Sequence, residues 1–112
     1  MDLPDIVKMM RKGEPIPVDS LDLMLVRCAG EYAYYASMLE TVLVEKPTKW
    51  SEMRGKEGIK SDTQADRLWE ASEDGRNEIG LRLRMKAIEK MLSALRSMAE
   101  TARRELLNTK YS

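Results

Sequence analysis

The sequence predicts an all-α protein: a helical hairpin of two long helices plus short helices, which assembles into a helical-bundle homo-oligomer. Three observations support this prediction. Apolar residues recur with helical 4-3 spacing in two long segments, no alternating run of β-branched residues predicts a strand, and the first long segment is apolar on nearly every face. A chain of 112 residues has room for a single helical domain with a small core.

Residues 1–18 are predicted to form a short helix and a connection. Pro4 suits the first turn of a helix, and Gly13 is a natural stop. One face of this predicted helix is apolar and carries Leu3, Ile6, Val7 and Met10. The following stretch "EPIPVD" is expected to be extended, because a proline disfavours helix in the residue before it.

The first long helix is predicted over residues 19–46, with Asp19 or Ser20 as its cap and Pro47 as its end. Its 4-3 seam consists of Leu21, Leu25, Cys28, Tyr32, Tyr35, Leu39 and Val42. The other faces are apolar too, through Leu23, Met24, Val26, Tyr34, Met38 and Val44. A helix that is apolar nearly all round is normally buried on several sides. So short a chain has too few other helices to cover it, and we therefore expect other subunits to do so.

Residues 47–60 are expected to form a loop with Trp50 as its only large anchor. Residues 61–108 are expected to form a short helix, started by a Ser61–Gln64 capping box, that leads into a long C-terminal helix. Gly75 is the expected break or bend between the two. The seam of the long helix consists of Leu81, Met85, Ile88, Leu92, Leu95, Ala99, Ala102 and Leu106.

Basic residues on this last helix are the candidate nucleic-acid contacts. At 100° per residue they fall opposite the seam or on its flank: Arg82, Lys86, Lys90, Arg96, Arg103 and Arg104. Such a row can follow the phosphates of a nucleic acid. Glu89 and Glu100 interrupt the row and no aromatic residue lies within it, so a solvated face is the simpler interpretation for one chain. In an oligomer, several such rows would add up.

Arg84 projects within the apolar arc, where a buried cation needs a partner, and Glu31 and Glu40 are the nearest candidates. We therefore place Arg84 in the predicted oligomer interface, whose other members are Leu25, Tyr32, Tyr35, Leu39, Leu92 and Leu95. Tyr32, Tyr34 and Tyr35 cannot all face one core; an interface or stacking on bases are both open to them. Cys28 lies on the seam and is expected to be an inert core thiol.

Composition speaks against catalysis. The chain has no His and one Cys, so it offers no Cys/His metal site and no Ser-His or Cys-His nucleophile pair. No glycine-rich phosphate loop is present, and no metal or other cofactor is expected. The net charge of zero gives no whole-chain attraction to nucleic acid or membrane. The acidic start does not have the pattern of a signal peptide, no run is long enough to span a membrane, and a cytoplasmic protein is expected.

The order of these segments resembles the UvsY-type recombination mediators of phages. The resemblance covers residues 19–108: a tyrosine-bearing helix around "DSLDLMLVRCAGEYAYYASMLETVLVEK", a basic middle, the acid-capped "SDTQADRLWEASEDG", and a Lys/Arg-rich helix. It assigns no individual residue. It implies an oligomer that binds single-stranded DNA and helps to load a recombinase in the host cytoplasm, without catalysis. The alternatives are a structural or assembly protein of a virion or scaffold, and a small inhibitor or adaptor that binds a host protein.

Overall fold

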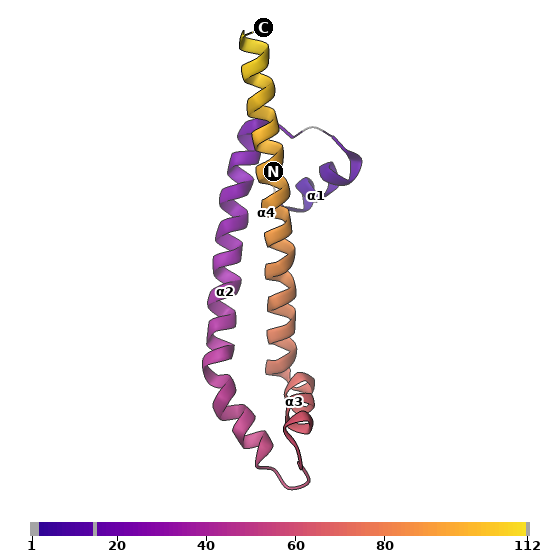
Figure 1. Cartoon of the computed structure of the whole chain (residues 1–112), viewed down its shortest axis with the longest axis vertical. Coiled ribbons are helices and arrows are strands. Elements are labelled where there is room, and N and C mark those ends of the chain that lie inside the picture. Colours follow the sequence, from indigo (N-terminus) through magenta and orange to yellow (C-terminus); the bar gives the residue numbers. More distant parts are fainter. Residues whose placement is uncertain (1–2, 15, 112) are drawn as a thin grey trace. The chain divides into compact units, whose positions relative to one another are not determined.

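The computed structural model describes residues 3–14 and 16–111, which form four helices and no strand. These are α1 (Leu3–Lys12), α2 (Val18–Arg54), α3 (Asp62–Ala71) and α4 (Glu73–Tyr111) (Figure 1). The predicted all-α fold is confirmed. The described chain divides into two compact units, each treated by itself: unit 1 is the chain up to Tyr32 and from Ile88 onward, and unit 2 runs from Ala33 to Ala87.

Helices α2 and α4 run antiparallel in both units. In unit 1, Asp22, Cys28 and Tyr32 of α2 contact Arg103, Met91 and Glu89 of α4, in that order. In unit 2, Tyr35, Lys46 and Lys49 contact Arg84, Glu78 and Asp74, in that order. Residue numbers rise along α2 as those of the α4 partners fall. The two long helices therefore pair as the predicted hairpin.

The core of unit 1 confirms the predicted seam and adds one residue to it. Leu21, Cys28 and Leu95 are fully or almost fully buried, and the Cys28 thiol lies 3.7 Å from Met91 Sδ. Burial, with the nearby Glu31 carboxylate, raises the pKa of Cys28 and keeps the thiol protonated. Met24, expected on another face, is also fully buried. Met24 lies three residues after Leu21 and four before Cys28, so it shares their face of α2, whereas the predicted seam residue Leu25 is only half-buried.

The α4 seam was predicted to continue to Leu106, but the buried part of the seam ends before that residue. Leu106 is 69% exposed, whereas Ala99 is buried. The reason is the point at which α2 begins: the ion pair between Arg103 and Asp22 lies only four residues inside the start of α2. Beyond it, α4 has no α2 neighbour to cover its seam.

Pro47 does not end the first long helix, which continues to Arg54 and bends toward that end (Figure 1). A proline inside a helix removes one backbone hydrogen bond and costs about 3 kcal/mol. Side chains close to Pro47 are tied to other helices of unit 2, with Lys49 Nζ 2.7 Å from Asp74 Oδ2 and Trp50 Nε1 2.8 Å from Asp66 Oδ1. These contacts stabilise the helical turns around Pro47, which the proline by itself disfavours.

The predicted loop over residues 47–60 is correspondingly shorter. Trp50 belongs to α2, and the connection runs only from residue 55 to residue 61, where Gly58 adopts a φ of 89°. The Arg54 side chain stays on this connection, donating to Asp62 Oδ1 at 2.9 Å and to the Ile59 carbonyl at 3.2 Å.

Helix α3 begins with the predicted capping box. Ser61 Oγ accepts a hydrogen bond from the Gln64 amide at 3.2 Å, and Gln64 Oε1 accepts one from the Lys60 amide at 2.6 Å. The reciprocal bond thus reaches one residue further back than the usual pattern. The buried face of α3 consists of Ala65 and Trp69.

The break between α3 and α4 falls at Ser72, three residues before the expected Gly75. The Ser72 amide donates to the Leu68 and Trp69 carbonyls, and its Oγ accepts the Gly75 amide at 3.0 Å. Gly75 is buried in the first turn of α4, where a Cβ would overlap the Trp69 carbonyl and lie 2.9 Å from Glu70 Cα. Glycine is needed there because the first turn of α4 passes close to the backbone at the end of α3, with only Ser72 between the two helices.

Gly75→Ala should therefore destabilise the protein by about 1–3 kcal/mol, because backbone atoms must move to admit the methyl group. Gly80→Ala is the matched control: it lies in the interior of α4 with no atom within 4 Å of the added carbon. That variant should be more stable by about 1 kcal/mol. Urea unfolding followed by circular dichroism measures both, and an unchanged midpoint for Gly75→Ala would contradict the steric explanation.

Candidate nucleic-acid interface

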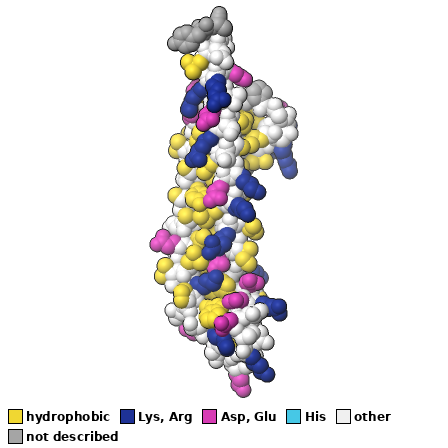
Figure 2. Space-filling model, viewed as in Figure 1, with side chains coloured by type: hydrophobic (Ala, Val, Ile, Leu, Met, Phe, Trp, Pro, Cys, Tyr) yellow, Lys and Arg dark blue, Asp and Glu magenta, His cyan; other side chains and the backbone are white. Residues whose placement is uncertain are grey.

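The six predicted phosphate contacts are all exposed on α4. Arg82 and Lys86 lie in unit 2, and the other four, Lys90, Arg96, Arg103 and Arg104, lie in unit 1. Figure 2 shows that basic side chains on the face drawn are interspersed with acidic and apolar ones. The face drawn therefore carries no continuous basic surface.

Two of the six cations are already paired within the chain. Arg103 Nη2 lies 2.9 Å from Asp22 Oδ1, and Arg82 Nε lies 3.8 Å from Glu78 Oε2. The remaining four make no ion pair with any described residue: Lys86, Lys90, Arg96 and Arg104. Exposed ion pairs contribute little to stability, so Arg103 can exchange Asp22 for another anion at small cost. The four unpaired cations need give up no partner to meet a phosphate.

Within one chain, Arg84 does not form the ion pair considered for it, and its predicted place in an oligomer interface stays a prediction. It is exposed, and its guanidinium carbon lies 5.7 Å from the centroid of the Tyr35 ring, with no ion pair to Glu31 or Glu40 in the described part of the chain. The position of Arg84 is at the edge of the apolar arc, and a long side chain can lie along an aromatic ring there while its charged end stays in water. No buried counter-ion is then required.

Residues of the predicted oligomer interface are largely engaged inside one chain. Leu39 and Leu95 are buried in their own units, and Leu25, Tyr32, Tyr35 and Leu92 are half-buried. The large apolar side chains left exposed on the two long helices are different ones: Leu23, Val26, Leu106 and Leu107 in unit 1, and Tyr34, Met38, Val44, Ile79 and Leu83 in unit 2. Whether the predicted seven contact another subunit stays a prediction.

The Tyr32 hydroxyl donates to Glu89 Oε1 at 2.8 Å, and this hydrogen bond raises the pKa of Tyr32 above its usual value of 10.0. A raised pKa in the folded state means that the bond stabilises the fold below pH 10 and is lost as the pH rises through the new pKa. One acid that interrupts the basic row is thus occupied by a tyrosine of α2.

Glu89→Gln should lower the pKa of Tyr32 toward its usual value, because the charged acceptor is removed. Ultraviolet titration of tyrosinate formation follows this change. Glu100→Gln, which removes another exposed carboxylate from α4, is the control and should leave the titration curve unchanged. If both variants titrate like the wild type, the bond between Tyr32 and Glu89 is absent in solution.

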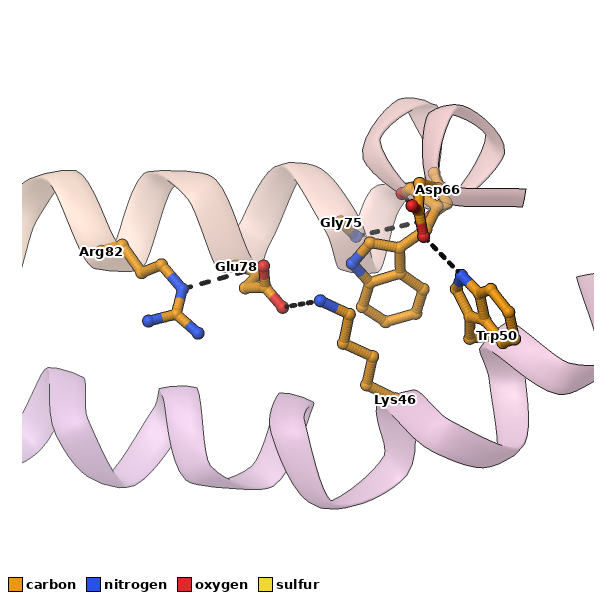
Figure 3. Close-up of polar contacts among 8 residues, drawn as sticks. Lys46, Trp50, Asp66, Gly75, Glu78 and Arg82 are labelled. Carbon is orange, nitrogen blue, oxygen red and sulfur yellow. Dashed lines mark hydrogen bonds and ion pairs between the residues drawn. The ribbon is translucent and has the colours of Figure 1, made fainter. Parts of the chain in front are cut away.

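A polar cluster in unit 2 holds α2, α3 and α4 together (Figure 3). Glu78 is only 8% exposed and lies between two cations, with Lys46 Nζ at 2.8 Å from Oε1 and Arg82 Nε at 3.8 Å from Oε2. Lys46 Nζ also lies 5.4 Å from the centroid of the Trp69 ring. Because its carboxylate oxygens face a cation of α2 and a cation of α4, Glu78 is suited to holding these helices together.

Residues 76 and 77 were not singled out from the sequence, yet they help to line a groove in unit 2. Arg76 and Asn77 line it together with Arg84 and Gly80 of α4 and Met38 of α2, and the groove has a volume of about 250 Å³. Arg76, Gly80 and Arg84 recur every fourth residue on one face of α4, which is the signal that was available in the sequence. The contribution of α2 was visible only once the helices were paired.

Comparisons with protein-family models, with curated proteins and with solved structures find no match for this chain. None of the helices described has a stretch long and apolar enough to cross a membrane.

Proposed function

We propose that this protein is a non-enzymatic, homo-oligomeric recombination mediator of phage type, which binds single-stranded DNA and assists the loading of a recombinase. The observation that carries the proposal is the set of exposed α4 cations that have no carboxylate partner among the described residues, namely Lys86, Lys90, Arg96 and Arg104. The order of segments, which resembles UvsY-type mediators, supports the same function.

Assembly is the second part of the proposal. Each chain offers few phosphate contacts and has a net charge of zero, so strong binding requires that several copies act together. The exposed apolar side chains supply a reason for copies to associate, since Val26 and Val44 of α2 are each about 70% exposed. These outward residues of α2 are the proposed contacts between copies, because much of the inner seam is already buried within the chain.

A structural or assembly protein is the alternative, and the interspersed acids and bases seen in Figure 2 favour it. In that case the exposed apolar residues pack only against protein, and the α4 cations serve solubility. A small inhibitor or adaptor that covers the same residues with one host protein is a further version of this alternative.

Titration of a labelled single-stranded oligonucleotide at several salt concentrations tests the function. We expect affinity to fall linearly with salt on logarithmic axes, as counterions are released. Reversing two charges, Lys86→Glu with Lys90→Glu, should reduce that slope by about 1.4, because each phosphate that a cation neutralises on a single strand adds about 0.7 to it.

The matched control is Lys56→Glu with Lys60→Glu, an equal charge change at exposed residues of the connection between α2 and α3. The salt dependence of DNA binding by this control should stay close to that of the wild type. Absence of binding by the wild type at low salt would remove the proposed function in favour of the assembly protein. Loss of the oligomer on reversing Lys86 and Lys90 would assign those residues to a protein interface.

A further inference from the structure

The groove in unit 2 is lined by two arginines and one asparagine beside the apolar Met38, Val42 and Leu81, and no carboxylate is among the described residues that line it. Arg76 and Arg84 are both exposed and make no ion pair with any described residue. Asn77 adds an amide that can donate and accept hydrogen bonds. Eight residues of helix separate the two arginines, or about 12 Å along α4, so a strand lying along the helix would place different phosphates at the two guanidinium groups.

Two aromatic rings of α2 lie near Arg84. The Arg84 guanidinium carbon is 5.7 Å from the Tyr35 ring centroid, and the Tyr35 ring is in turn 5.7 Å from that of Tyr34, at an angle of 58°. Tyr34 is 63% exposed. The basic residues of α4 have no aromatic neighbours in sequence, but the hairpin brings the Tyr35 ring to Arg84, and the exposed Tyr34 ring lies next to Tyr35. An exposed aromatic ring close to a cation can hold an unpaired base by stacking.

Gly80 keeps this groove open. It lies in the interior of α4, where glycine weakens a helix relative to alanine. Nothing lies within 4 Å of the Cβ that another residue would add, so no close packing in the described chain calls for a glycine there. Any longer side chain at this position would enter the space between Arg76 and Arg84.

We propose that this groove, together with the neighbouring Tyr34–Tyr35 pair, is a nucleotide-binding site for single-stranded DNA, with phosphates at Arg76 and Arg84 and a base stacked on Tyr34. The site rests on the proposed function for the identity of its ligand. It is separate from the six α4 cations predicted from the sequence, and it gives Arg84 a role in binding DNA. An acidic segment of a protein, including a second copy of this chain, would satisfy the arginines but would leave Tyr34 without a stacked base.

Three variants test the site by oligonucleotide titration at low salt: Gly80→Gln fills the groove, Arg84→Gln removes a charge, and Tyr34→Ala removes the ring. Each should weaken binding about fivefold or more. Gly30→Gln is the control for added bulk, because Gly30 also has no atom near its Cβ position but lies on α2 outside the groove. Arg67→Gln, at an exposed position of α3, is the control for the removed charge. Both controls should bind like the wild type.

A second ligand separates stacking from charge. An oligonucleotide with abasic positions should bind the wild type more weakly than the intact one, and Tyr34→Ala should bind the two ligands equally. If the wild type binds DNA but the three groove variants bind as tightly, the groove is not a nucleotide site, although the proposed function survives. If the wild type does not bind DNA at all, the proposed function is contradicted, and the nucleotide site with it. A changed oligomer size for Gly80→Gln in light scattering would overturn the nucleotide site and assign the groove to a protein contact.

Discussion

The ion pair between Lys46 and Glu78 is the contact on which the structure of unit 2 depends. A carboxylate as buried as that of Glu78 requires a cation close by, and Lys46 supplies it from α2 at 2.8 Å. The same lysine lies over the Trp69 ring and thereby joins α3 to the pair. Because Lys46 directly precedes Pro47, the helix is fixed at the point where the proline would otherwise end it. Within unit 2, Lys46 thus contacts both α4 and α3, on the same helix that supplies Met38 to the groove.

Features set by one helix alone could be predicted from the sequence. Spacing placed Leu21, Cys28 and Leu95 in the core and the α4 cations on the exposed side, since both depend only on angle around a helix axis. The Ser61 cap of α3 could also be predicted, because it depends only on residues close in sequence. Features that depend on a second helix were missed. The continuation of α2 past Pro47 requires Asp66, Asp74 and Glu78, which lie far along the chain. The role of Gly75 depends on the Trp69 carbonyl.

The candidate site shows the same division. Each cation of α4 could be placed from the sequence, but its partners could not: Asp22 for Arg103, and the Tyr35 ring for Arg84. The groove joins residues of α2 with residues of α4, and its charge becomes evident only after the antiparallel pairing is known. Pairing also changes the interface that we expect. The inner seam serves the hairpin itself, so we expect copies to associate through outward residues such as Val26 and Val44.

Assembly connects these observations to the proposed function, because one chain with zero net charge offers too few contacts to hold DNA in physiological salt. The most direct measurement is the mass of the protein in solution by light scattering, over a range of micromolar concentrations. We expect one defined assembly larger than a monomer that persists at high salt, since apolar contacts are not screened. A stable monomer at these concentrations would contradict the assembly of copies and, with it, the summing of their basic groups on DNA.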